Sequence, residues 1–147
     1  MSEKAASALR SAPRGRAFAV ALLLGTAALA HAADPSPTYR AKRRTAADTP
    51  VELRTLAHWD SQCRSLSLPV LVWVENPAHG RVEEREDTVP GHAAATGGTS
   101  CEGVPMRGLR LIYAPEAGWH GLDHLRFDVR FNTSDPIVHY EFEVAVR

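Results

Sequence analysis

The chain has 147 residues, and its 17 lysines and arginines balance 17 aspartates and glutamates, so that the formal net charge is zero. This balance argues against the general affinity for nucleic acid or anionic lipid that a strongly basic chain has. At this length the chain has room for one domain of ordinary size.

The N-terminal segment has the three parts of a secretory signal peptide. Residues 1–16 carry four basic side chains and one acid, and an apolar run of 14 residues follows at 17–30. Ala30-His31-Ala32 then supplies the small residues of a cleavage site. The run is shorter than the roughly 20 residues of a membrane-spanning helix, although an uncleaved anchor stays open as the alternative. We therefore expect cleavage near Ala32, a periplasmic or secreted protein, and no membrane span in the mature chain.

Cleavage of residues 1–32 removes four basic residues and one acid, which leaves 115 residues and a formal charge of −3. Residues 33–50 contain the basic cluster Arg40-Ala41-Lys42-Arg43-Arg44 and little apolar periodicity, so we interpret them as a flexible linker. The folded domain is expected at residues 51–147.

The two cysteines of the chain, Cys63 and Cys101, both lie in this exported part. In an oxidising compartment a single pair most simply forms a disulfide, with two free thiols or a metal site as the alternatives. A bridge across 38 residues would contribute about 4 kcal/mol to the free energy of unfolding in the chain-entropy model.

Short β-strands are expected along the whole domain, with no segment of helical periodicity. The expected strands are residues 51–59, 68–74, 80–86, 108–114, 125–131 and 138–146. The run at 68–74 is almost entirely apolar, which favours a central strand buried on both faces, whereas the charged run at 80–86 favours an edge strand. Residues 88–100 contain Pro90, Gly91, Gly97 and Gly98, and we interpret this stretch as a long mobile loop.

The last two strands alternate with period two and are joined by the turn-forming run 132–136, which predicts an antiparallel hairpin. Arg126 and Arg130 would then face Glu141 and Glu143 across the hairpin. Six to seven short strands in about 100 residues predict an all-β fold, an immunoglobulin-like antiparallel β-sandwich with one disulfide, and a small barrel is the competing architecture.

Two stretches resemble the signature of bacterial immunoglobulin-like and cadherin-like repeat domains. Residues 76–82 (NPAHGRV) are similar to the turn P-x-H-G-x-V, and residues 113–127 (YAPEAGWHGLDHLRF) are similar to Y-x-P-x-x-G-[aromatic]-x-G-x-D-x-F. The match extends over residues 66–147 and is nearest to small exported proteobacterial proteins with a single such domain and two cysteines at these places. That group has no assigned activity, so the resemblance implies fold and compartment. The chain departs from the pattern at Trp119, His120 and His124.

The motif residues have structural roles in turns. A proline ends a strand, a glycine supplies a positive φ or a close approach, and an aspartate accepts backbone N–H groups. Trp119 is expected to fill the space under its loop. The residues given such roles are Pro77, Gly80, Pro115, Gly118, Trp119, Gly121 and Asp123.

The histidines are the candidates for a metal site. His120 and His124 lie in one predicted loop, where Asp123 or Glu116 and also His79 could join them around a divalent cation. The alternative is that they are polar residues on a solvated surface.

No pattern of a catalytic site is present: no serine lies in G-x-S-x-G, and the paired carboxylates fall on an exposed edge. We therefore expect no enzyme and no cofactor. The leading hypothesis is a cell-envelope module that binds an unknown envelope protein or a glycan, or that has a structural role. A metal-binding protein that uses the loop histidines and a small inhibitor of a periplasmic enzyme are the alternatives.

Overall fold

The structure is a computed structural model that describes residues 36–94 and 98–147, and the predicted signal peptide lies outside them. In these residues no helix is long and apolar enough to cross a membrane. The described part is all-β. Its strands are β1 (Thr38–Thr45), β2 (Val51–Ala57), β3 (Val70–Glu75), β4 (Gly80–Pro90), β5 (Pro105–Pro115), β6 (Gly121–Arg130) and β7 (Val138–Val146).

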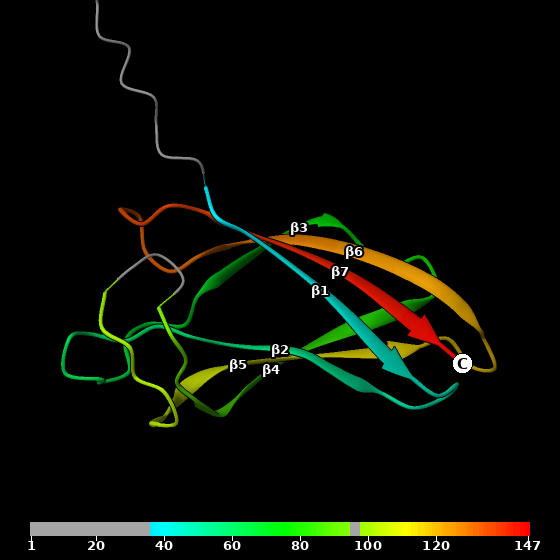
Figure 1. Ribbon diagram of the computed structural model, residues 1–147, viewed down its shortest axis with the longest axis horizontal. Coiled ribbons are helices and arrows are strands. Elements are labelled where there is room, and N and C mark those ends of the chain that lie inside the picture. The colour runs from blue at the N-terminus through cyan, green and yellow to red at the C-terminus, as the bar shows by residue number, and fades with distance from the viewer. Residues whose placement is uncertain (1–35, 95–97) are drawn as a thin grey trace, which may run out of the picture. The chain divides into compact units, whose positions relative to one another are not determined.

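The seven strands form two sheets that lie face to face as the two layers of a sandwich (Figure 1). One sheet has the order β1-β7-β6-β3 and the other has the order β2-β5-β4. All neighbouring strands are antiparallel except β1 and β7, which run parallel. This order is that of an immunoglobulin-like sandwich whose first strand joins the sheet of its last strand, so the predicted fold class is confirmed.

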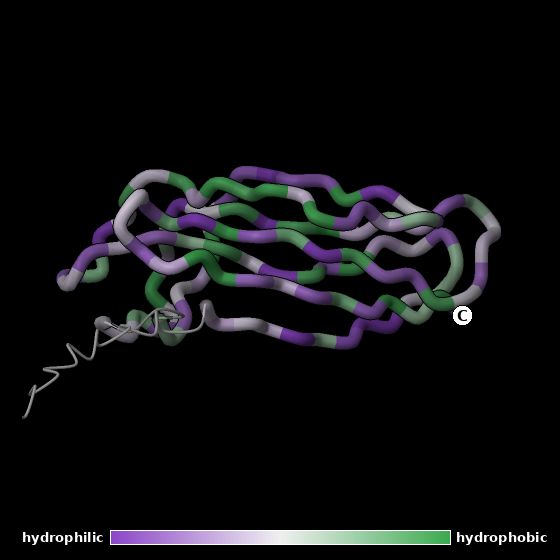
Figure 2. The backbone as a smooth tube through the Cα atoms, turned by 90° about the horizontal axis from the view of Figure 1, so that it is seen from above, coloured by the Kyte–Doolittle hydropathy of each residue, from purple (hydrophilic) through white to green (hydrophobic). Residues whose placement is uncertain are grey.

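The core forms because apolar side chains recur at every second position and so share one face of each strand. Along β7 the buried positions are Val138, Tyr140, Phe142, Val144 and Val146, and polar residues occupy most of the positions between them. Figure 2 shows the same alternation of hydropathy along the strands. In the centre, the ring of Phe127 stacks on Tyr140 at 5.2 Å and on Phe142 at 5.8 Å between centroids.

The prediction of a flexible linker at residues 33–50 is wrong for Thr38–Thr45, which form β1. This strand pairs with β7 over eight residues, and its side chains Tyr39 and Ala41 pack against the core. The charges that suggested a solvated linker form contacts on the outer face: Arg40 pairs with Glu141 at 2.6 Å, and Lys42 pairs with Glu143 at 3.0 Å. The folded domain therefore starts before residue 51.

The prediction of a central strand at residues 68–74 is also wrong, because β3 is the last strand of its sheet. Leu71 and Trp73 point into the sandwich and pack against the core, and the rings of Trp73 and Phe127 lie 5.1 Å apart. Val70, Val72 and Val74 remain 61%, 58% and 52% exposed on the outer face. The charged strand β4 lies at an edge, as its composition predicted.

The predicted disulfide is confirmed: Cys63 and Cys101 are bonded, with their Cα atoms 5.7 Å apart. It joins the loop between β2 and β3 to the loop between β4 and β5, at one end of the sandwich. The two ends therefore differ. We call this one the disulfide end, and the other, where the β1–β2, β3–β4 and β5–β6 turns lie, the turn end (Figure 1).

Candidate functional site

The turn end is organised around the buried carboxylate of Asp123, which is 2% exposed. Its Oδ1 accepts the N–H of Ala78 at 2.8 Å, and its Oδ2 accepts the N–H of His79 at 2.9 Å. The hydroxyl of Tyr113 donates to the same Oδ2 at 3.0 Å, and the N–H of His124 donates to Oδ1 at 3.0 Å. One carboxylate thus ties the β3–β4 turn to β5 and β6.

Most of the predicted turn residues surround this carboxylate. Gly118 has a φ of +71°, and its N–H donates to Asp48 at 2.8 Å, while Gly121 has a φ of +149° beside the ring of Trp119. Gly80 lies so close to Tyr113 that a Cβ would meet its ring. The other predicted turn residues lie at the strand ends: Pro77 comes shortly before β4, and Pro115 is the buried last residue of β5. Trp119 packs against the core. The buried carboxylate is used in hydrogen bonds between the turns, which is a structural role.

The three histidines of the predicted metal site do not come together. The ring of His79 stacks on Trp119 at 4.6 Å between centroids, and its Nδ1 lies 3.6 Å from Glu116. His124 lies on the outer face of β6 beside Glu143 of β7, and His120 is exposed in the turn before β6. Within the described residues, no group of three or more His, Cys, Asp or Glu side chains is placed to hold a metal ion. A loop-histidine metal site therefore stays a prediction.

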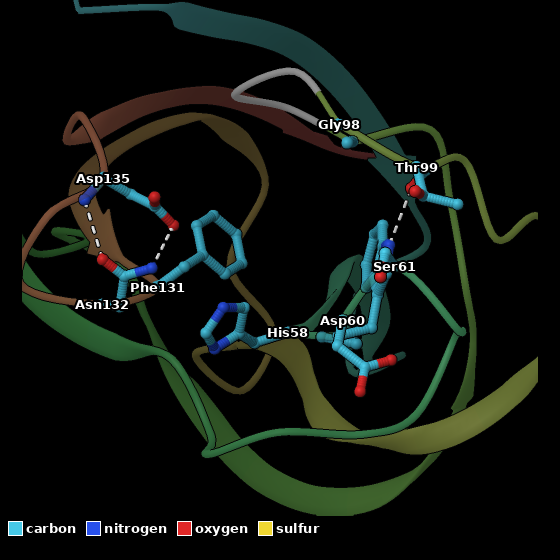
Figure 3. Close-up of a pocket in the computed structure, with 11 residues that line it drawn as sticks. His58, Asp60, Ser61, Gly98, Thr99, Phe131, Asn132 and Asp135 are labelled. Carbon is cyan, nitrogen blue, oxygen red and sulfur yellow. Dashed lines mark hydrogen bonds between the residues drawn. The ribbon is translucent and has the colours of Figure 1, made fainter.

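The disulfide end contains a pocket with a volume of about 350 Å³. It opens between three loops and reaches the end of β2, so both sheets contribute to its walls. Figure 3 shows His58 and Phe131 pointing toward one another, and their ring centroids are 6.1 Å apart. Trp59 lines the same space, together with the polar residues Ser61, Asn132 and Asp135.

The loop that carries His58 and Trp59 is closed by Asp60. Its Oδ1 accepts the N–H groups of Gln62 at 2.9 Å and of Arg64 at 3.0 Å, and the Arg64 guanidinium binds Oδ2 at 2.7 Å. The backbone N–H of Arg64 is the largest cause that holds the pKa of Asp60 below its usual value. The charged Asp60 therefore stabilises the loop that carries the rings of His58 and Trp59.

Two cross-links hold this loop to the next one. The indole N–H of Trp59 donates to the carbonyl oxygen of Thr99 at 2.8 Å, as Figure 3 marks, and the disulfide joins Cys63 to Cys101. The cysteine pair packs with Trp59 in a small second core. A pocket wall fixed in this way loses little conformational entropy when a ligand binds.

The third wall is the β6–β7 turn, which Asn132 closes. Its side-chain oxygen accepts the N–H groups of Ser134 at 2.6 Å and Asp135 at 2.8 Å. Its amide nitrogen donates to Oδ2 of Asp135 at 2.7 Å, so the carboxylate and the amide lie side by side at the pocket (Figure 3). Together they offer both an acceptor and a donor to a ligand.

Burial shifts the pKa of two side chains, His92 and Tyr113, which lie near the ends of the sandwich. Burial is the first cause that lowers the pKa of His92, the charge of Arg54 adds to it, and the ring contacts Thr55 Oγ1 at 2.6 Å. At the turn end, burial followed by the hydrogen bond to Asp123 raises the pKa of Tyr113. Both groups are held neutral at pH 7, which suits structural roles.

Aromatic and polar side chains share the pocket. Aromatic faces from His58, Trp59 and Phe131 meet a few polar groups, which is the usual composition of a ligand site. Hydrolysis by a serine would need His58 bonded to Ser61 and to a carboxylate. Among the described residues no hydrogen bond makes these links, and Asp60 is bound to Arg64 instead.

None of the residues that the sequence singled out as a candidate site lines this pocket. Its walls come from segments about 40 residues apart along the chain, so no local motif contains them. The available signal was the aromatic pair Trp59 and Phe131: Trp59 lies two residues after the end of β2, Phe131 directly follows β6, and a polar loop comes after each. Loops at one end of a rigid sandwich are where binding residues tend to lie.

No family model, curated protein or solved structure matches the chain.

Proposed function

We propose that the protein is an exported module of the bacterial cell envelope that binds a glycan in the pocket at the disulfide end. The observation that carries the proposal is the composition of that pocket, in which aromatic rings and paired polar side chains share one opening of about 350 Å³. Such a volume falls within the range of small-molecule sites.

A sugar ring has the complementary chemistry. Its C–H faces pack on aromatic rings such as His58 and Phe131, and its hydroxyl groups both donate and accept hydrogen bonds. Asp135 would accept from a hydroxyl, and the amide of Asn132 and the hydroxyl of Ser61 would complete the set. A rigid pocket wall, fixed by the disulfide, would preserve this geometry in the absence of ligand.

The cell-envelope location rests on two features of the chain. Residues 1–32 have the composition of a signal peptide, and a disulfide persists in an oxidising compartment. The resemblance to bacterial immunoglobulin-like repeat domains supports the same location. Expression of the full chain in a Gram-negative host should release a periplasmic product whose N-terminus is residue 33, as measured by mass spectrometry. An intact N-terminus in the membrane fraction would contradict export by cleavage.

The binding proposal is tested by calorimetric titration with soluble peptidoglycan fragments and with oligomers of N-acetylglucosamine. Binding to at least one probe is expected, with a dissociation constant below about 1 mM. Ser61→Tyr introduces a ring at the pocket and should weaken binding at least 10-fold. Ser67→Tyr is the matched control, because Ser67 is exposed in the same loop and does not line the pocket.

Two results would contradict the proposal. One is the absence of binding to every glycan probe up to millimolar concentration. The other is binding that Ser61→Tyr and Ser67→Tyr weaken equally, which would place the ligand elsewhere on the domain.

A further inference from the structure

The pocket at the disulfide end contains one carboxylate that has no cationic partner. Two acids line the pocket, Asp60 and Asp135. Asp60 is neutralised by the guanidinium of Arg64, whose Nε lies 2.7 Å from Oδ2. Among the described residues no lysine, arginine or histidine forms an ion pair with Asp135, which accepts a hydrogen bond from the neutral amide of Asn132 at 2.7 Å. The negative charge of Asp135 is therefore available to a ligand.

The loops that meet at this end carry more acid than base. The β2–β3, β4–β5 and β6–β7 loops hold three carboxylates and one guanidinium, from Asp60, Glu102, Asp135 and Arg64. Arg130 directly precedes the third loop, but it is exposed between the buried Val129 and the partly buried Phe131, so it belongs to the opposite face of β6. A cationic ligand is attracted by this charge distribution, and an anionic one is repelled.

Aromatic rings border the same opening. Phe131 begins the turn that carries Asp135, and His58 and Trp59 come from the facing β2–β3 loop (Figure 3). The face of an aromatic ring attracts a cation that lies within about 6 Å of its centroid. A carboxylate and aromatic faces around one opening are the combination of groups that recognises an ammonium ion.

We propose that the glycan bound in this pocket carries a free, protonated amino group, as a hexosamine without its N-acetyl group does. This inference rests on the proposed function and names the substrate class of the same site. The ammonium donates a charge-assisted hydrogen bond to Asp135, while the C–H face of the sugar packs on the rings of Phe131 and His58.

An N-acetyl group on the sugar nitrogen weakens this match. The acetamide is neutral, so its hydrogen bond to Asp135 is not between opposite charges, and it has no cation–π attraction to the rings. Hydrogen bonds between charged groups are roughly twice as strong as those between neutral groups. The unpaired charge of Asp135 therefore favours the free amine over the acetylated one.

The aromatic rings favour a sugar amine over the amine of a lysine side chain. A hexosamine holds its ammonium on a rigid ring whose C–H face can lie on Phe131 at the same time. A lysine carries its ammonium on a flexible stem of four carbons, which loses rotamer entropy when it is bound. We therefore expect the amino sugar to bind more tightly.

The first test is calorimetric titration of the purified, oxidised protein with the trimer of glucosamine and with the trimer of N-acetylglucosamine. At about pH 6 an amine is protonated and an ordinary aspartate is ionised. The wild type should bind the glucosamine trimer at least ~10-fold more tightly than the acetylated trimer. Because salt screens accessible charges, this preference should shrink when sodium chloride is raised from about 0.05 to 0.5 M.

The second test assigns the preference to Asp135. Asp135→Asn removes the charge and keeps a side-chain oxygen that can accept from Asn132. The ratio of the two dissociation constants should then fall from at least ~10 to below about 3. Glu102→Gln is the matched control, because it removes the same charge from an exposed residue of a neighbouring loop that does not line the pocket. The control should keep the wild-type ratio, and both variants should melt within about 3 °C of the wild type.

A third probe separates the two sources of an amine. A short peptide with blocked ends and a single lysine has the ammonium without the sugar ring. It should bind at least ~10-fold more weakly than the glucosamine trimer under the same conditions.

The possible failures are distinguishable from one another. If the acetylated trimer binds as tightly as the glucosamine trimer, the amine preference is wrong while glycan binding stands. A preference that survives in Asp135→Asn, or that Glu102→Gln removes equally, would also overturn the inference. Tight binding of the lysine peptide without binding of the glucosamine trimer would identify a peptide ligand and overturn it as well. Failure of every probe to bind would overturn the inference together with the proposed function.

Discussion

Replacing Asp123 by alanine is expected to lower the free energy of unfolding by about 4.5 kcal/mol, because three donors from other segments lose their acceptor at about 1.5 kcal/mol each. The N–H groups of Ala78 and His79 and the hydroxyl of Tyr113 would be left without the carboxylate. For a domain of this size the loss corresponds to a fall in melting temperature of about 15 °C.

Two milder substitutions, Asp123→Asn and Tyr113→Phe, test the same estimate even if Asp123→Ala does not fold. Asp123→Asn keeps the shape but turns an amide N–H₂ toward N–H or O–H donors, so it should cost about 2–3 kcal/mol. Tyr113→Phe removes one donor and should cost about 1 kcal/mol. In the Tyr113→Phe background, Asp123→Ala should cost about 1 kcal/mol less than in the wild type, because one of the bonds is already absent.

The assay is equilibrium unfolding in urea at pH 7, followed by the fluorescence of the tryptophans, of which Trp119 lies at the turn end. The slope of the free energy against urea should be unchanged, since the variants expose the same surface on unfolding. A cost below about 1 kcal/mol for Asp123→Ala, or additive costs in the double variant, would refute the reasoning that this carboxylate holds the turn end together.

Three further predictions concern the rest of the fold. Replacing both Cys63 and Cys101 by alanine should cost about 4 kcal/mol for the 38-residue separation, measured by urea unfolding against the wild type with and without reductant; an unchanged midpoint would contradict it. Gly108→Ala should cost about 2–3 kcal/mol, since a Cβ in β5 would meet a carbonyl oxygen of β2 and a valine of β4; a melting temperature equal to that of the wild type would show that the β2-β5-β4 sheet has room to adjust. The lowered pKa of His92 means that the folded state favours its neutral ring, so the stability it contributes is full above its ordinary pKa of 6.5 and falls as the pH drops through 6.5 toward the folded pKa. His92→Gln should therefore flatten the decline of the urea midpoint between about pH 7 and pH 5, and an equally steep decline in the variant would assign it to other groups.

Strict alternation made the later strands predictable from sequence. Residues 125–131 and 138–146 alternate, and the structure has the expected antiparallel hairpin of β6 and β7. Strand β6 starts four residues earlier than predicted, at Gly121, and ends at Arg130. Arg126 faces Glu141 as predicted, whereas Glu143 faces His124, because the register follows from the buried faces more than from charge pairs. The disulfide was predictable from compartment chemistry and the presence of one cysteine pair.

The errors at β1 and β3 have one physical cause: composition does not report how many neighbours a strand has. β1 looked like a linker because its outward residues are basic, yet eight residues of ladder hold it to β7. β3 looked like a central strand because residues 70–74 are apolar, yet it has one neighbour and exposes its valines. The pocket was not predictable from the sequence because the disulfide and three loops bring its residues together from distant positions.

The parallel pairing of β1 with β7 sets the order in which the domain assembles. Arg40 and Glu141, which meet across this pair, are separated by 101 positions along the chain. A chain that is synthesised from its N-terminus must therefore carry β1 unpaired until β7 has been made. Pairing of β1 with β7 is then a late, non-local step of folding. It slows folding and leaves the incomplete chain accessible to chaperones and to proteases.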